Sequence, residues 1–171
     1  MSSICVQPPS QATVGTILYP PIVGKFDSAF LEGQEITTAW GILTLIDGSG
    51  QVVDSESTVA GRNRPTLDGT PSGMGMYLSD TGGSRRGGGS SSRSGNPYSH
   101  FYFKFDRIQI NAPGTYSLMI GVYRMSNITG LPEPVTTAET DRVTVHNEQV
   151  PAERPSANEQ QILSDLRKSF R

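Results

Sequence analysis

The residues that most often do chemistry in enzymes are sparse in this sequence. Its two histidines, His100 and His146, stand without a cysteine or carboxylate at the spacing of a metal-binding set. The single cysteine, Cys5, lies in a predicted strand with no basic neighbour that would activate its thiol. The sequence therefore predicts no catalytic residue, no metal site and no cofactor, and an enzyme is the functional class that it favours least.

Two further motifs match functional patterns without the structural context that those functions need. Gly73–Gly75 and the glycine run that follows it are not framed by a strand and a helix, so ordinary loop glycine explains them better than a phosphate-binding loop. Asn127-Ile128-Thr129 is an N-glycosylation sequon by pattern. No apolar signal segment lies near Met1, and we expect the sequon to be unused.

Arginines in the middle of the chain could bind phosphate groups. The net charge is −2, yet residues 60–110 carry seven basic and three acidic side chains, whereas residues 1–59 carry one basic and six acidic. The candidates in this basic stretch are Arg62, Arg64, Arg85, Arg86 and Arg93. They could neutralise phosphates without reading base sequence. A solubilising, phosphorylatable loop is the more ordinary explanation, and both interpretations stay open.

The size and composition of the chain bound its architecture. Its 171 residues fit one domain, 1–171, with a single core, and 19 glycines and 12 prolines favour turns over long helices. A lone cysteine excludes an internal disulfide, and no apolar run is long enough to span a membrane. We expect a soluble, intracellular, all-β domain.

Apolar runs that end at turn residues predict the first strands. Trp40–Ile46 is almost continuously apolar, and Asp47–Gly50 and then Gln51–Val53 follow it, which predicts a buried strand, a turn and a partner strand. Ile4–Gln7 predicts a short edge strand, because the two prolines after it cannot donate to a ladder. Tyr19–Phe26 is predicted to be extended.

Aromatic residues alternate with polar ones over residues 101–106, which predicts a strand with three phenylalanines on one face. A turn at Asn111–Gly114 separates it from a second strand over residues 115–122, and we expect the two to form a hairpin-like unit. Pro113–Leu118 is typical of a late strand in an immunoglobulin-like sandwich, where a tyrosine, here Tyr116, bonds back to the backbone. The predicted fold is therefore an all-β, immunoglobulin-like β-sandwich.

Two segments depart from the strand pattern. Residues 60–97 include a Gly/Ser/Arg-rich run without an apolar side chain and predict one long flexible insertion loop. Ser156 and Glu159 form a capping box, and apolar residues then recur on one helical face, which predicts an amphipathic C-terminal helix over residues 156–170. Packing of this helix on its own sandwich is favoured over packing on another chain.

Several motifs resemble, in order along nearly the whole chain, those of the velvet domain of fungal regulators. They are Gln7-Pro8, Gly15, Pro20-Pro21-Ile22-Val23, the aromatic strand from Phe101, Gly114-Thr115-Tyr116-Ser117-Leu118 and the closing block Pro151–Glu159. The most specific parts are the aromatic strand leading to Gly-x-Tyr-x-Leu and the Pro-Ala-Glu-Arg-Pro-Ser-Ala block. The positions that carry the family motifs are Gln7, Pro8, Gly15, Pro20, Pro21, Gly114 and Tyr116.

This resemblance implies a sandwich similar to the Rel homology domain. It also implies a nuclear location, with the cytoplasm left open, and homo- or heterodimers with other velvet-domain proteins. The implied function is regulation of transcription through DNA binding, in the control of sporulation and other fungal development and of secondary metabolism.

The sequence departs from the family where the family is held to contact DNA. Family members carry several basic residues and a cysteine after Gln-Pro, and a basic segment before Pro-Pro-Ile-Val; here residues 9–14 are uncharged and only Thr16–Tyr19 separate Gly15 from Pro20. DNA binding would then depend on Lys25 and the five arginines, or on a partner's cations. Two hypotheses remain: a regulator that binds double-stranded DNA, and a dimerising adaptor without DNA binding of its own.

Overall fold

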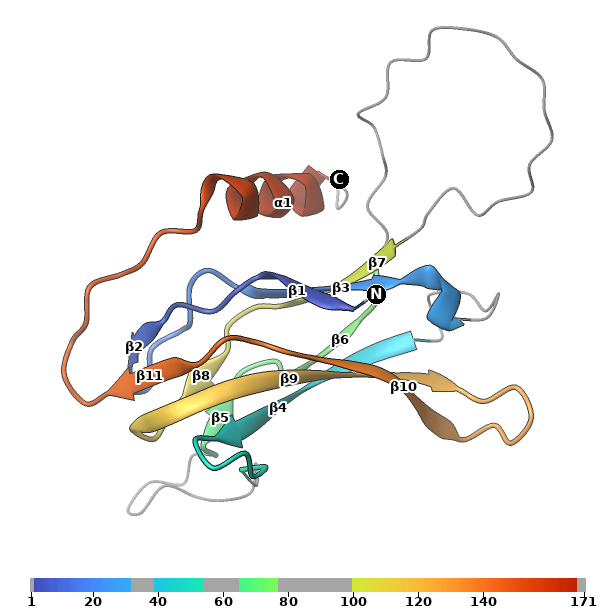
Figure 1. The fold of residues 1–171 in the computed structure, drawn as a ribbon, viewed down its shortest axis with the longest axis horizontal. Helices are drawn as coiled ribbons and strands as arrows, with labels where there is room; N and C mark the ends of the chain where they lie inside the picture. Colours follow the sequence, from blue (N-terminus) through green and yellow to red (C-terminus); the bar gives the residue numbers. More distant parts are fainter. Residues whose placement is uncertain (1, 32–38, 54–64, 77–99, 169–171) are drawn as a thin grey trace, which may run out of the picture.

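The computed structural model describes residues 2–31, 39–53, 65–76 and 100–168, and most of its regular structure is β (Figure 1). This part of the chain contains eleven strands, one short 3-10 helix and one α-helix. The predominance of strands confirms the all-β prediction. Among the described residues, no helix is long and apolar enough to cross a membrane.

The smaller of the two main sheets has three antiparallel strands in the order β1-β3-β7, which are Ser3–Val6, Ile22–Asp27 and His100–Phe105. The edge position of β1 confirms the short edge strand predicted before Pro8. In β7 the three phenylalanines are at most 1% exposed, while the side chains between them are half-buried. The predicted alternation is therefore present, with its apolar side turned to the core.

The larger sheet has six strands, with β9 at its centre. Its order is β2 (Gln11–Thr13), β11 (Val143–His146), β9 (Gly114–Met125), β4 (Ala39–Asp47) and β6 (Ser72–Met74), and β10 (Pro132–Glu139) also pairs with β9. Strand β9 pairs with β4 along one edge and with β11 and β10 along the other. The predicted partner strand at Gln51–Val53 is reduced to one bridge, between Ile46 and Val52.

The core lies between these two sheets, which face each other (Figure 1). Phe26, Phe101 and Phe103 of the small sheet form a cluster with ring centroids 5.5 to 5.7 Å apart. Gly41 of β4 lies opposite, where an added Cβ atom would come within 2.9 Å of the Phe103 ring. Glycine at this position allows the large sheet to approach the aromatic cluster closely.

The predicted hairpin-like unit of residues 101–106 and 115–122 is wrong, because β7 and β9 belong to different sheets. After β7, Arg107 takes a positive φ of 59°, and β8 (Gln109–Ile110) pairs with β5 (Leu67–Asp68) in a two-stranded sheet. This turn carries the chain from one sheet to the other. The apolar faces of the two strands therefore meet across the core instead of side by side.

Part of the predicted loop 60–97 is ordered in strands. Residues 65–76 contain β5 and β6, and the backbone of Met76 forms a bridge with Tyr102 of β7. Leu67 is buried in the core. Its burial explains why this stretch takes a fixed position in the fold although its neighbours in sequence are rich in glycine and serine. Residues 60–64 and 77–97 of the predicted loop lie outside the described residues.

Helix α1 (Ala157–Lys168) lies across the outer face of the small sheet (Figure 1). Leu166 is 1% exposed and packs with Val6 and Val23 in a second apolar cluster. The predicted capping box is present, because the Glu159 N–H donates to Ser156 Oγ at 3.3 Å and the Ser156 N–H donates to Glu159 Oε2 at 2.8 Å. These contacts confirm the helix and its packing on its own sheet.

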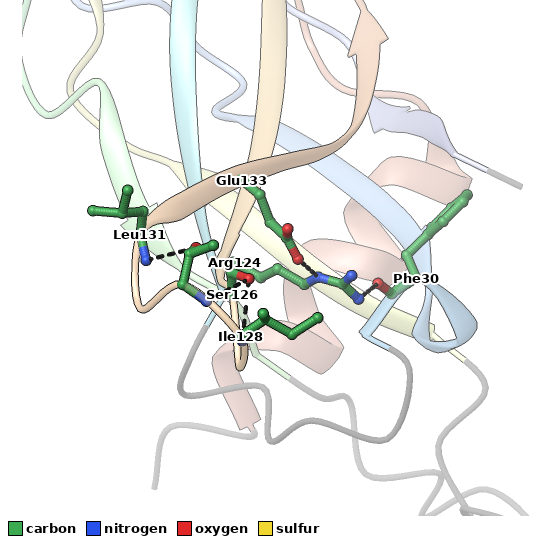
Figure 2. Close-up of polar contacts among 7 residues, drawn as sticks. Phe30, Arg124, Ser126, Ile128, Leu131 and Glu133 are labelled. Carbon is green, nitrogen blue, oxygen red and sulfur yellow. Dashed lines mark hydrogen bonds and ion pairs between the residues drawn. The ribbon is translucent and has the colours of Figure 1, made fainter.

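The hairpin of β9 and β10 is braced at its far end, as Figure 2 shows. Arg124 Nε lies 2.8 Å from Glu133 Oε1, and Arg124 Nη1 donates to the carbonyl of Phe30 at 3.1 Å. Phe30 belongs to the 3-10 helix η1 (Ser28–Leu31). This contact joins the hairpin to the end of β3, while Ile128 at its tip is 95% exposed.

Candidate functional site

The segment after β1 is bound by the closing block of the chain. The Gln7 N–H donates to Glu159 Oε1 at 3.0 Å, and the Ser10 N–H donates to both carboxylate oxygens of Glu153, at 3.1 and 3.0 Å. Ser10 Oγ also donates to Glu153. Two motifs more than 140 residues apart in sequence therefore form one structural unit, which we call the end clamp.

Hydrogen bonds to the two clamp carboxylates lower their pKa values. For Glu153, the side-chain and backbone bonds from Ser10 hold the pKa below its ordinary value. For Glu159, burial alone would raise the pKa, but the bonds from Gln7 and Ser156 outweigh burial and lower it. Both groups are therefore ionised when the clamp is closed at neutral pH.

The other motif positions shape the same end of the molecule. Gln7 Oε1 accepts a bond from the Asp141 N–H at 2.9 Å. Gly15 has a φ of +69°, which favours glycine, and its N–H bonds to the Ile110 carbonyl at 2.9 Å. The Tyr116 hydroxyl donates to the Pro113 carbonyl at 3.2 Å, which confirms the predicted bond back to the backbone near the start of β9.

The clamp brings α1 and its preceding segment beside the chain that links β2 to β3, and a groove lies between them. Its two hollows have volumes of about 330 and 420 Å³ and share Tyr19, Leu163 and Arg167. Pro20 follows a cis peptide bond at Tyr19, and Pro21 lines the first hollow. We call these two hollows the cationic groove, because the charged residues around them are Lys104, Asp106, Arg107, Arg154 and Arg167.

Four cations and one carboxylate give the cationic groove a net positive charge. Asp106 Oδ2 lies 3.0 Å from Lys104 Nζ, so these two charges offset each other. Among the described residues, no carboxylate lies within ion-pair distance of Arg107, Arg154 or Arg167, and all three are exposed. The three guanidinium groups are therefore available to an anionic ligand.

Apolar side chains are also exposed in the cationic groove. Ile17 is 53% exposed and Tyr19 is 59% exposed, on the uncharged segment that leads into β3. A tyrosine ring open to solvent can stack on an unpaired base, and arginines beside it can contact phosphates of a single strand or of a duplex. The groove therefore has the donors and the ring that a nucleic acid, or another polyanion with flat groups, would use.

The cations of the groove differ from those that the sequence predicted for DNA binding. Lys25 lies half-buried on β3, on the side that faces α1, and does not line the groove. The predicted residues Arg62, Arg64, Arg85, Arg86 and Arg93 lie outside the described residues. The sequence did contain one signal of the groove. The spacing of Leu163 and Arg167 places both side chains on one side of a helix, so that they can line the same surface.

The structure gives no support for nucleophilic or metal chemistry in the described residues. Burial raises the pKa of the Cys5 thiol to about 11, so the thiol is protonated at neutral pH. No three His, Cys, Asp or Glu side chains of the described part are grouped so that they could hold a metal ion. Nε2 of His146 is buried without a hydrogen-bond partner among these residues.

No protein-family model matches the chain, and a search of curated protein sequences finds no significant match. A proposed function for this chain therefore rests on the geometry of the end clamp and of the cationic groove.

Proposed function

We propose that this chain is a velvet-type nuclear regulator of fungal development and secondary metabolism, which binds double-stranded DNA in the cationic groove and pairs with other velvet-domain proteins. The resemblance of its motifs suggests the family. The observation that carries DNA binding is the position of Arg107, Arg154 and Arg167 around Tyr19.

The groove offers a substitute for the basic residues that the sequence lacks after Gln7-Pro8. The resemblance assigns DNA contact to the stretch after Gln7-Pro8, residues 9–14, and places a further basic segment before Pro20; both are uncharged here. Ile17 and Tyr19 of that segment line the groove, and its cations come from the turn after β7 and from the C-terminal segment. On this proposal, other elements supply the charge at the place where the family's own segment would supply it.

The proposed fold is an immunoglobulin-like β-sandwich similar to the Rel homology domain. Its support is the pair of facing sheets and the bond from Tyr116 to the Pro113 carbonyl at the start of β9. In a sandwich of this kind, loops at one end carry the contacts to a ligand. The cationic groove lies on such connections and on the helix that packs beside them.

The test is a titration of fluorescent random-sequence duplex DNA, followed by anisotropy at about 50 and about 150 mM salt. We compare the wild type with Arg107→Asn/Arg154→Gln/Arg167→Gln, in which asparagine tolerates the positive φ of residue 107. The variant should bind more weakly and lose up to about 3 from the slope of log K against log salt.

A single substitution has a matched control: Arg142→Gln is the control for Arg154→Gln. Arg142 is also exposed but does not line the groove, so its replacement should leave the affinity within about twofold. Unchanged affinity and salt slope in the triple variant would contradict DNA binding in this groove.

A second candidate function is a dimerising adaptor that does not bind DNA itself. The observation that favours it is on the opposite side of the molecule, where the outer face of the large sheet exposes apolar side chains. Association of the protein without any affinity for DNA would favour this adaptor.

A further inference from the structure

Tyr19 lies where three hollows of the surface meet. It lines both hollows of the cationic groove, and it also lines a third hollow with a volume of about 240 Å³. We call this third one the side hollow. The described residues that line the side hollow include no lysine or arginine, so Tyr19 stands between a cationic surface and a surface without cations.

The side hollow carries hydrogen-bonding groups that suit a neutral ligand. It lies between β2 and the segment after β11, and the exposed residues Gln11 and Gln149 line it. Their amides can both donate to and accept from the edge of a base. Glu153 also lines this hollow, but its carboxylate accepts bonds from the Ser10 N–H at 3.1 and 3.0 Å. The side hollow can therefore take a base, whereas phosphates are attracted to the groove.

The backbone around Tyr19 is fixed although Tyr19 itself is 59% exposed. Leu18 is 4% exposed, and its N–H donates to the carbonyl of Ile108 at 2.8 Å. Pro20, on the other side of Tyr19, is also buried. An exposed aromatic ring on an anchored segment is the kind of platform on which proteins stack the bases of a single strand.

We infer that the cationic groove and the side hollow together bind an unpaired strand of DNA in preference to a duplex, with one base stacked on Tyr19. Arg107, Arg154 and Arg167 contact the phosphates on one side of this ring, and the amides of the side hollow face base edges on the other. The inference rests on the DNA binding of the proposed function and names the form of DNA that the same site favours.

A duplex can use only part of this surface. Its bases remain stacked on one another, so it presents phosphates and base edges but no free ring face. The arginines can still contact its backbone, whereas Tyr19 gains a partner only if a base leaves the stack, which costs free energy. In a single strand the base faces are already free, and stacking of one base should strengthen binding by about 5- to 150-fold.

The test compares two fluorescein-labelled probes by anisotropy at about 150 mM salt. One probe is a single strand of about 12 nucleotides with a mixed sequence that cannot pair with itself, and the other is the same strand annealed to its complement. The wild type should bind the single strand at least about tenfold more tightly than the duplex. Equal affinity for the two probes, or tighter binding of the duplex, would overturn the inference.

Two substitutions at Tyr19 show whether the ring causes this preference. Tyr19→Ala should weaken binding of the single strand about tenfold and leave binding of the duplex within about twofold. Tyr19→Phe keeps the ring and should bind the single strand as the wild type does. The far-UV spectrum and the unfolding midpoint of Tyr19→Ala should match the wild type, because Tyr19 is exposed.

A third probe separates stacking from charge. The same single strand with abasic sites at its central positions keeps every phosphate but has no base there to stack. The wild type should bind it about tenfold more weakly than the intact strand, and Tyr19→Ala should bind the two within about twofold of each other. If Tyr19→Ala favours the intact strand as strongly as the wild type does, no base stacks on Tyr19 and the inference is wrong.

Failure of the inference can be told apart from failure of the proposed function. Duplex binding that depends on the three arginines, without a preference for the single strand, would contradict the inference alone. Binding of the single strand that needs Tyr19, without measurable binding of the duplex, would support the inference and contradict binding of double-stranded DNA. Absence of binding to either probe would contradict both.

Discussion

On the outer side of the small sheet, α1 lies across the strands and cations surround it. In the described part of the chain, the outer side of the large sheet has no helix on it and carries a half-buried tryptophan and tyrosine beside exposed methionines. The first surface suits a polyanion and the second suits another apolar surface. One core therefore supports two outer surfaces of different chemistry that share no residues.

The largest expected effect on stability comes from removing the anchor of α1. Leu166→Ala should destabilise the protein by about 2 to 4 kcal/mol, because Leu166 is 1% exposed between Val6 and Val23. The measurement is urea unfolding. Leu131→Ala, at a residue that is 65% exposed, is the control and should cost less than about 0.5 kcal/mol.

The thiol of Cys5 reports separately on the same helix. Its pKa of about 11 arises mainly from burial beside the cluster of Leu166. In Leu166→Ala that burial decreases, so the pKa should fall toward its ordinary value of 9.0 and a thiol reagent should react faster at pH 8. Equal reaction rates in the wild type and the variant would mean that α1 does not shield this side of the sheet.

A smaller effect is expected at the end clamp. Glu159→Ala removes the capping box and the acceptor for the Gln7 N–H, and should cost about 1 to 2 kcal/mol. Glu148→Ala, at an exposed glutamate just after β11, is the matched control and should stay within about 0.5 kcal/mol. Equal unfolding midpoints for the two variants would show that the clamp contributes nothing to stability.

The end clamp should also make stability depend on pH in the acid range. The folded pKa values of Glu153 and Glu159 lie below the ordinary 4.5, so their contribution is full above pH 4.5 and is lost as the pH falls through the folded values. The measurement is the difference in unfolding midpoint between the wild type and Glu153→Gln/Glu159→Gln. It should be constant from about pH 7 to about pH 5 and shrink below.

The smallest effect on stability is expected at Ile42, on the outer side of the large sheet. Ile42→Lys removes no core contact, because Ile42 points away from the other sheet. At a concentration well below that of association, its unfolding free energy should match the wild type within about 0.5 kcal/mol. A larger loss would mean that Ile42 contributes to the fold and would weaken the contrast between the two outer sides.

Local sequence patterns correctly predicted the elements whose structure depends on residues close to them in the sequence. The alternation over residues 101–106 placed three phenylalanines in the core, and Ser156 with Glu159 marked the start of α1. Tyr116 was predicted to bond back to its own backbone, which requires contact only three residues away. In each case the residues that determine the structure lie in the same short segment as the structure itself.

The features that sequence reasoning missed depend on contacts between distant segments. The cationic groove needs Arg107 beside Arg167, and only the docking of α1 on β1 and β3 brings them together. Residues 65–76 form strands because β4 and β8 are available as partners, which their own composition does not indicate. The predicted hairpin was wrong because the chain pairs β8 with the distant strand β5 after leaving β7 and only then enters the large sheet in β9.

The end clamp has a consequence for the order in which the molecule is assembled during synthesis. Gln7 is synthesised 152 residues before Glu159, its partner. Chains begin to fold from the N-terminal part as it emerges, so the sheets can form before the clamp closes. The cationic groove, which needs Arg154 and Arg167, is then complete only after the segment that carries them has been synthesised and has docked.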